Sequence, residues 1–193
     1  MNLPANASPD RSPSTSAPSG TGSDLAGNSQ LLRLAVGARM YAVPIERVRE
    51  ILKVTQLTAL PLMPEFVRGV MNLRGAVVPV IDLGARLGGG ATALARRTCV
   101  VIIEQRSTDG TAQTMGVLVD AVHEVVDTTD ADLEPVPHLG TEIAAEFLAA
   151  MARLRGEIVP VLALERVLDE EALTQAIAGH AQAAPAQTGA RLH

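Results

Sequence analysis

Short apolar segments, separated by glycine, proline and charged residues, recur through most of the chain. The clearest of them are rich in Val, Ile and Leu and span residues 31–36, 40–45, 76–83, 99–104, 115–119 and 158–164. Segments of this length and composition, bounded by turn residues, are typical of β-strands. Gly37, Ala38 and Arg39 separate the first two segments, which are therefore predicted to form a hairpin. Several short strands joined by turns predict a mainly β protein built from barrels or a sandwich.

Helical periodicity is confined to the C-terminal part of the chain. Over residues 164–178 apolar side chains recur at spacings of three and four, which predicts a C-terminal helix. The acidic run 169–171 is consistent with a break and a fresh helix start, because acids favour the positive end of the helix dipole. Residues 1–30 and 180–193 have no hydrophobic period, so we expect a disordered N-terminal tail rich in Ser, Pro and Gly and a flexible C-terminal tail.

The chain repeats its own sequence pattern. Residues 66–87 align without a gap with residues 147–168, at an offset of 81 positions, and nine of the 22 aligned residues are identical. Residues 41–51 align in the same way with residues 115–125, at an offset of 74 positions. Matching blocks in the same order predict two copies of one β module.

The two copies are predicted to form two lobes, over about residues 31–87 and 97–162. Each copy is short for a large core of its own, so we expect the lobes to pack on each other across an apolar interface. Gly88, Gly89 and Gly90 lie between the copies and lack the Lys-Ser or Lys-Thr of a phosphate-binding loop. We expect this glycine run to form a flexible joint between the lobes.

Residues that occur in both copies are predicted to serve the shared fold. An acidic residue, an arginine and a glycine stand at matched places: Glu50, Arg74 and Gly75 in the first copy, and Glu124, Arg155 and Gly156 in the second. We expect each acid to pair with its arginine and to pin a strand to a tight turn that the glycine permits. Positions that differ are better candidates for function. They are Gly69, Asn72 and Asp82, which align with Ala150, Arg153 and Ala163.

Composition narrows the classes of function. The net charge of −5 and the aromatic content of 2% argue against a nucleic-acid partner, because such proteins present clustered basic and aromatic side chains. The single cysteine, Cys99, excludes an intrachain disulfide and is expected to be a buried, inert thiol. We find no signal peptide and no apolar run near the roughly 20 residues of a spanning helix, so we expect an intracellular protein without direct membrane insertion.

No catalytic, metal-binding or cofactor-binding pattern stands out. The four histidines lack the spacing of metal ligands, and no Gly-x-Ser-x-Gly motif occurs. Asp82 and Asp120 follow apolar segments, where acids are commonly solvated or turn-forming, and we do not expect a general acid–base pair. A ligand-binding barrel or a hydrolase would need a pocket with convergent polar groups, for which the sequence offers no cluster. We therefore expect neither an enzyme nor a cofactor.

Three segments, in this order, resemble the CheW domain of bacterial chemotaxis. They are YAVPIERVREI from residue 41, LTALPLMPEFVRGVMNLRGAVVPVIDL from residue 57 and MGVLVDAVHEVVD from residue 115. The block Gly-Val-x-Asn-Leu-Arg-Gly over residues 69–75, combined with the following Val-Pro-Val-Ile-Asp, is the specific marker. The resemblance extends over about residues 31–168, nearly all of the chain expected to be ordered.

The resemblance implies two SH3-like, five-stranded β-barrel lobes and a non-enzymatic adaptor in the cytoplasm, at membrane-associated receptor arrays. It implies two main partners, namely the cytoplasmic helical tip of a methyl-accepting chemoreceptor and the regulatory domain of the histidine kinase CheA. Other CheW-like domains would be further partners within an array. Neither the pathway nor the residues that contact the kinase follow from the motifs.

The resemblance also implies a receptor-facing region that includes Val48, Glu50, Gly69, Asn72 and Arg74. Val122 and Val125, in the matching block of the second copy, are further candidates for the receptor-binding groove. The repeat thus assigns Glu50 and Arg74 to the fold, whereas the resemblance places them at a binding site. Both assignments hold if the ion pair between Glu50 and Arg74 orders the strand and the turn that border the receptor-binding groove.

Overall fold

The computed structural model describes residues 29–54, 56–106, 112–137, 145–169 and 173, and within them the fold is mainly β, as the sequence predicts. Its strands are β1 (Ser29–Val36), β2 (Arg39–Pro44), β3 (Val48–Lys53), β4 (Val67–Leu73), β5 (Ala76–Asp82), β6 (Cys99–Arg106), β7 (Ala112–Val119), β8 (Ala121–Thr128), β9 (Leu133–Glu134), β10 (Leu148–Leu154) and β11 (Glu157–Leu162). Its short helical turns are η2 (Ile45–Arg47), α1 (Leu83–Arg86), η3 (Asp130–Asp132), η4 (Ala145–Phe147) and α2 (Leu164–Val167).

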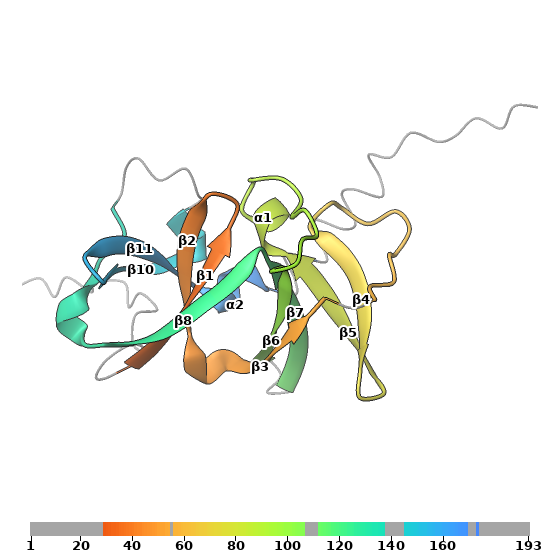
Figure 1. The fold of residues 1–193 in the computed structure, drawn as a ribbon, viewed down its shortest axis with the longest axis horizontal. Coiled ribbons are helices and arrows are strands. Elements are labelled where there is room, and N and C mark those ends of the chain that lie inside the picture. The colour runs from red at the N-terminus through yellow and green to blue at the C-terminus, as the bar shows by residue number, and fades with distance from the viewer. Residues whose placement is uncertain (1–28, 55, 107–111, 138–144, 170–172, 174–193) are drawn as a thin grey trace, which may run out of the picture.

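The strands form two sheets that lie side by side as two lobes (Figure 1). Lobe one has the strand order β3-β6-β7-β5-β4, and lobe two has the order β8-β1-β2-β11-β10-β9. Neighbouring strands are antiparallel except for β5 with β7 and β2 with β11, which are parallel. The two SH3-like lobes are confirmed, although the edge strands of each sheet do not pair to close a barrel. Lobe one has the five expected strands, and lobe two adds the two-residue β9.

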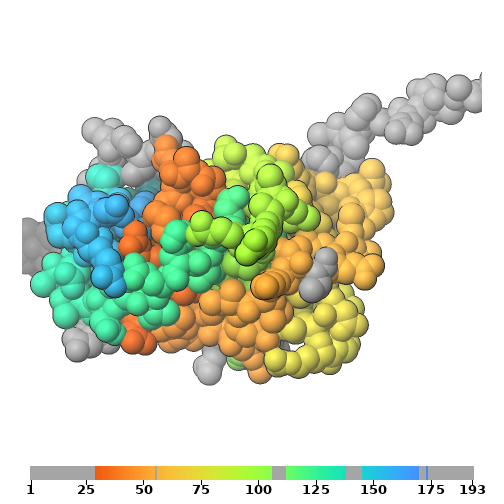
Figure 2. Space-filling model, viewed as in Figure 1, coloured from red at the N-terminus to blue at the C-terminus, as the bar shows by residue number. Residues whose placement is uncertain are grey.

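Each lobe combines strands from both copies of the repeat. β1 and β2 belong to the first copy but lie in lobe two, whereas β6 and β7 belong to the second copy and lie in lobe one. The register follows the repeat, because Val80 pairs with Gly116 in lobe one and Val161 pairs with Ala42 in lobe two. In Figure 2 the orange atoms of the first hairpin lie among green and blue atoms of the second copy. The lobes therefore arise by reciprocal exchange of the first hairpin and do not coincide with the sequence repeats.

The glycine run at residues 88–90 does not join the lobes, so the expected flexible joint is wrong. This segment connects β5 to β6, and both strands lie in lobe one because the first hairpins are exchanged. The chain crosses between the lobes elsewhere, at η2 between β2 and β3 and at Asp120 between β7 and β8.

A buried carboxylate anchors the segment that follows β5. The side chain of Asp82 is fully buried, and its two oxygens accept hydrogen bonds from the amide and the hydroxyl of Thr92, each at 2.8 Å. The Ala85 amide donates to the same carboxylate at 3.3 Å, which caps α1. The Nη1 of Arg68 lies 3.6 Å away and supplies the opposite charge. Asp82 is thus a satisfied, buried cap rather than a solvated strand end.

Three clusters of buried side chains hold the fold together. One lies within lobe one and includes Val80, and one lies within lobe two and includes Val161. The largest draws on both sheets and contains Leu34 of β1 as well as Val117 of β7. Because burial of one such side chain stabilises by roughly 1.5–3 kcal/mol, this central core is the main force that joins the lobes. The expected apolar interface between the lobes is present.

Two matched hairpins share the same turn. Arg74 and Gly75 connect β4 to β5 with φ of 54° and 90°, and Arg155 and Gly156 connect β10 to β11 with φ of 51° and 84°. Positive φ at both central residues is typical of the type I′ turn, whose twist matches that of the flanking strands. Glycine therefore suits the second central position of the turn. The first central position holds an arginine, in a left-handed backbone conformation that residues other than glycine seldom adopt.

The ends of the fold lie close to their predicted positions. The first strand begins at Ser29, two residues before the predicted start. The predicted helix 164–178 begins at Leu164, but its first turn ends at Val167. Leu173 is again helical and donates from its amide to the Asp169 carbonyl at 2.9 Å, in agreement with a fresh start after a break. The rest of that helix and both predicted tails, up to residue 28 and from residue 180, lie outside the described residues.

We expect Asp82→Asn to loosen the segment that follows β5. An amide cannot accept all three hydrogen bonds of the carboxylate, and it removes the charge opposite Arg68. The free energy of unfolding should fall by about 2–4 kcal/mol, measured by urea denaturation, and the Thr92 amide should exchange faster. Asp120→Asn is the matched control, because that carboxylate accepts the Gly37 amide at the exposed tip of a hairpin. Equal losses in the two variants would contradict the anchoring role.

Candidate binding surfaces

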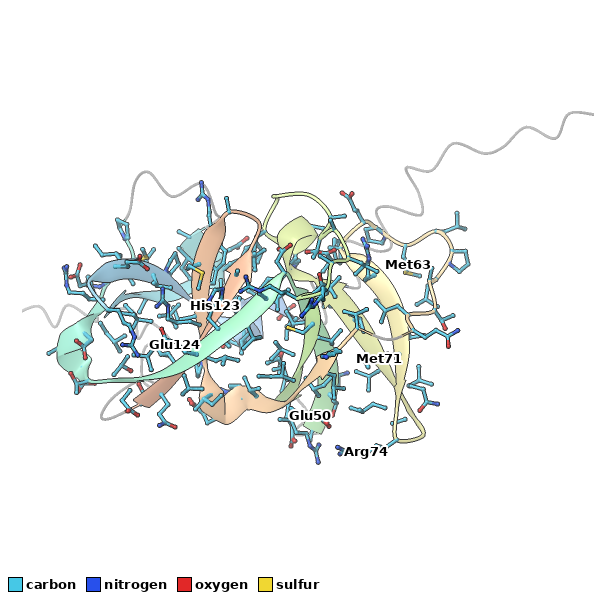
Figure 3. All side chains as sticks on the ribbon, in the orientation of Figure 1. Glu50, Met63, Met71, Arg74, His123 and Glu124 are labelled. Carbon is cyan, nitrogen blue, oxygen red and sulfur yellow. The ribbon has the colours of Figure 1, made fainter. Side chains whose placement is uncertain are left out.

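The two ion pairs that the repeat predicts are present. The Nη2 of Arg74 lies 2.9 Å from Oε2 of Glu50, and the Nη2 of Arg155 lies 2.8 Å from Oε2 of Glu124. Each arginine reaches from a type I′ turn to the edge strand of its lobe, β3 or β8. Figure 3 shows Glu50 and Arg74 close together on lobe one, with Glu124 on the other lobe. Each pair therefore ties a hairpin end to an edge strand.

The pair in lobe two is part of a larger network. Oε1 of Glu124 also accepts Nη1 of Arg33 at 3.0 Å, and Nη2 of Arg33 donates to Glu157 at 2.8 Å. In lobe one the residue that corresponds to Arg33 by strand register is Ile102, whose side chain is fully buried. Sequence analysis missed this network, because the block of the repeat that carries Arg33 has no visible match in the second copy.

The charge of Glu124 is stabilised by its neighbours. The hydrogen bond from Arg155 holds the pKa of this carboxyl below its ordinary value of 4.5. Partial burial opposes the shift, whereas the charges of Arg155 and Arg33 add to it. Glu124 is therefore charged at neutral pH and engaged on both of its oxygens.

Val48 and Val122 lie at the junction of the lobes. Val48 is the first residue of the edge strand β3 and Val122 the second residue of the matched edge strand β8, and both are partly buried against the central core while remaining partly accessible. Val125 lies on the opposite face of β8, because side chains alternate along a strand, and it is 45% exposed. Val48 pairs with Ile103, whereas the backbone of Val122 hydrogen-bonds with Cys99, four residues away on β6. Both valines thus contact the core that joins the lobes, at separate places, and Val125 points away from that core.

Gly69 acts through its backbone. It is buried, has a φ of 133°, and a Cβ at this position would lie 2.2 Å from the carbonyl oxygen of Thr58. This close approach allows two hydrogen bonds between the backbones of Thr58 and Val70, at 2.8 and 2.9 Å. Gly69 therefore holds the loop after β3 against β4.

Asn72 closes the first hairpin. Its Oδ1 accepts the Gly75 amide at 2.8 Å, whereas the matched Arg153 in lobe two pairs with Glu134. Asn72 itself is exposed and lies opposite Val77 in the ladder. Glu50, Asn72 and Arg74 therefore gather at one hairpin end of lobe one.

Exposed apolar residues lie at matched positions on both lobes, and of the four described next sequence analysis named only Val125. Their exposed fractions are 43% for Ile51 and 71% for Val77 in lobe one, and 45% for Val125 and 52% for Ile158 in lobe two. Each pair occupies the same two positions of the repeat, so the signal was present as an apolar residue at an alternate strand position. Such matched surfaces are candidates for contact with other proteins.

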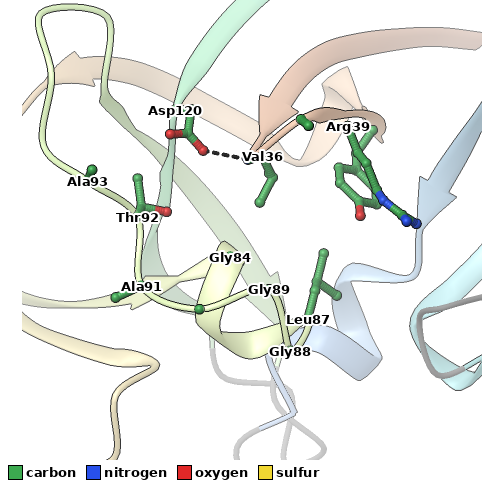
Figure 4. A pocket seen from close by; sticks show the side chains of 14 residues that line it. Val36, Arg39, Gly84, Leu87, Gly88, Gly89, Ala91, Thr92, Ala93 and Asp120 are labelled. Atoms are coloured by element: carbon green, nitrogen blue, oxygen red, sulfur yellow. Dashed lines mark hydrogen bonds between the residues drawn. The ribbon is translucent and has the colours of Figure 1, made fainter.

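A hollow of about 410 Å³ opens between the tip of the β1–β2 hairpin and the segment after α1 (Figure 4). Glycine and alanine form much of its wall, together with Arg39, Tyr41 and Asp120. Asp120 accepts the Gly37 amide at 2.7 Å and so braces the hairpin tip. None of the site residues predicted from the sequence lines this hollow.

Comparison with known proteins identifies the family. A model of the CheW-like domain matches residues 30–172. The chain belongs to the CheW family. It is 32% identical to the chemotaxis protein CheW of Rhizobium meliloti over 75% of this chain and 90% of that protein. The CheW of Klebsiella aerogenes is 29% identical, over 78% of this chain and 90% of its own length.

A solved structure agrees with this assignment. The scaffolding protein TtCheW of Thermoanaerobacter tengcongensis superposes with a TM-score of 0.63 at 31% identity. The match covers 70% of this chain and 84% of TtCheW. Among the described residues no helix is long and apolar enough to cross a membrane.

Gly69→Ala should destabilise the CheW fold strongly. The new Cβ would collide with backbone, which cannot move aside as a flexible side chain could, so we expect a loss of at least about 3 kcal/mol in urea denaturation. Gly75→Ala is the matched control, because its φ is also positive at 90° but nothing lies within 4 Å of the new Cβ. The control should lose only about 1–2 kcal/mol. A loss in Gly69→Ala no larger than in the control would disprove the close approach.

Lowering the pH should weaken the CheW fold through Glu124. Because the folded state depresses the pKa of this carboxyl, its contribution to stability is present above the ordinary value of 4.5 and is lost as the pH falls through the folded pKa. A carboxyl titration followed by NMR should place the Glu124 midpoint below 4.5. Glu124→Gln should be less stable than the natural protein near neutral pH, and the difference should shrink in acid. A midpoint at or above the ordinary value would contradict the network.

Proposed function

We propose that this CheW-family chain is a non-enzymatic scaffold that couples methyl-accepting chemoreceptors to the histidine kinase CheA. The observation that carries the proposal is the match of the CheW-like domain over residues 30–172, which spans both lobes. The names of its relatives, chemotaxis protein CheW and scaffolding protein, point to the same role. The site of action is the cytoplasm, at receptor arrays, and the role requires no cofactor.

The receptor tip is assigned to the junction of the lobes. Val48 and Val122 offer partly accessible apolar surface there, and the Glu50–Arg74 pair ties the neighbouring hairpin to β3. An amphipathic helix binds such a groove through apolar residues at helical spacing. Gly69 and Asn72 support the groove through the backbone of β4 and its turn. In this proposal both assignments of Glu50 and Arg74 hold, because the ion pair would order the border of the groove.

The regulatory domain of CheA, or another CheW-like domain, is assigned to the outer faces. Ile51 and Val125 point away from the central core on the two edge strands and are exposed. Two separate surfaces on one body raise the effective concentration of receptor and kinase for each other. Each contact can therefore be modest, for example micromolar at about −8 kcal/mol.

The direct test is kinase autophosphorylation. Purified CheA and receptor-containing membranes from the same organism are compared with and without this protein. The coupling role predicts that kinase activity depends on the receptor and its attractant only when the protein is added. Failure to bind either partner, with the protein folded, would reject the role.

Val48→Asp should separate the two binding activities. A charge on this apolar, partly buried surface should weaken binding of a receptor-tip fragment at least about tenfold and leave the affinity for the CheA regulatory domain within about twofold. His123→Asp is the control for receptor binding, because it places the same charge on the outward face of β8 and should leave the affinity for the receptor-tip fragment unchanged. Val48→Thr keeps the side-chain shape and covers the case in which the aspartate disturbs folding. Unchanged receptor binding in both Val48 variants would refute the groove assignment.

A further inference from the structure

The two phenylalanines of the chain meet one arginine between the lobes. Phe66 and Phe147 are the only ones in the sequence, and they occupy matched positions of the repeat. The guanidinium carbon of Arg86 lies over both rings, 5.4 Å from the centroid of Phe66 and 4.7 Å from that of Phe147. Both rings pack against the central core. A single cation thus makes cation–π contacts with both copies of the repeat.

The same arginine reaches the second lobe by a hydrogen bond. Arg86 ends α1, and its Nε donates to the carbonyl of Val167 in α2 at 3.0 Å. Val167 occupies the position in the second copy that matches Arg86 in the first. Burial lowers the pKa of Arg86, and the charges of Glu146 and Asp169 oppose that shift. The matched positions therefore hold one arginine and one valine, and the arginine makes the directed contacts.

The contact adds a directional restraint to an interface that also holds the hydrogen bond between Cys99 of β6 and the backbone of Val122 in β8. The chain crosses between the lobes at two places, η2 and Asp120, and two attachment points leave an axis about which the lobes can rotate. Apolar burial opposes separation, but it is non-directional. A planar guanidinium held by two rings and one carbonyl is directional and fixes an angle.

We infer that Arg86 is a positioning residue that fixes the orientation of one lobe relative to the other and, through it, the spacing of the edge strands β3 and β8, which carry Val48 and Val122. Those two valines pack on the same central core as Phe66 and Phe147. The role in lobe orientation is independent of any partner. Its consequence for receptor binding rests on the proposed function.

The repeat provides a rescue that a general loss of packing would not show. In Arg86→Val/Val167→Arg, the arginine extends from the second copy toward the same two rings. Glu65 stands at the position that matches Glu146, so an acidic residue is available near the transplanted cation as well. Arg86→Val alone should leave the relative orientation of the lobes less fixed, and the double variant should restore that orientation.

The lobe orientation can be measured with two spin labels. Ala76 of lobe one and Ala131 of lobe two are exposed, and cysteines placed there carry the labels. Cys99 is buried and is replaced by alanine in every variant. Arg86→Val should broaden the distance distribution and lower the melting temperature by about 4–8 °C, from the loss of the cation–π contacts and one hydrogen bond. Arg86→Lys keeps the charge but not the planar group, and it serves if the valine variant does not fold.

Receptor and kinase binding separate the possible results. Arg86→Val should bind a receptor-tip fragment about tenfold more weakly than the natural protein, because the spacing of β3 and β8 would change. Its affinity for the CheA regulatory domain should stay within about twofold of that of the natural protein. The double variant should recover most of the distance distribution and of the receptor affinity. An unchanged distribution in Arg86→Val, or equal broadening in the double variant, would overturn the positioning role whatever the partners are. A broadened distribution with unchanged receptor affinity would overturn the link to the groove.

Discussion

The exchange of the first hairpin between the two copies of the repeat is the constraint on which the rest of the structure depends. It requires β2 to pair in parallel with β11 and β5 to pair in parallel with β7, so that neither sheet is complete without the other half of the chain. The same exchange brings strands of both copies to the centre, where the largest core forms between the sheets. The edge strands β3 and β8 then flank the junction and carry the matched valines.

Near-symmetry with local departures explains how one small fold supports different contacts. The same ion pair occurs at matched places of the two lobes, between Glu50 and Arg74 and between Glu124 and Arg155. The departures are single residues: Arg33 where lobe one has Ile102, and Arg86 where the second copy has Val167. The first builds a charged network on lobe two, and the second sets a cation at the junction. A body with two similar lobes thereby presents two dissimilar surfaces, as a scaffold between unlike partners needs.

The sequence predicted the strand content, the repeat, the apolar interface and both ion pairs, because each leaves a periodic or duplicated pattern. It did not predict the hairpin exchange, because a repeat in the sequence does not show whether a strand pairs within its own copy or with a strand of the other copy. For the same reason the run 88–90 was misread as a joint. Asp82 was expected at a solvated strand end, and only the fold shows that Thr92 returns to satisfy it.

The candidate site was predicted in outline, and the structure redistributes its residues. Gly69 and Asn72 were chosen because they differ between the copies, and both serve backbone geometry, which a sequence does not reveal. Val122 and Val125 were taken together, although strand alternation places them on opposite faces. Ile51 and Val77 were missed, because an exposed apolar residue cannot be told from a buried one without the neighbouring strands.

Hairpin exchange also governs how the protein is made. During synthesis β3, β4 and β5 leave the ribosome before β6 and β7, so the sheet of lobe one lacks its middle until residue 119 has emerged. The hairpin of β1 and β2 waits longer still, until β11 is complete at residue 162. Pairings this distant along the chain are slow to form, since loop-closure entropy is lost before contacts compensate for it. The nascent first half therefore exposes unpaired strand edges until these later strands emerge, and such edges are the kind of surface that chaperones protect from aggregation.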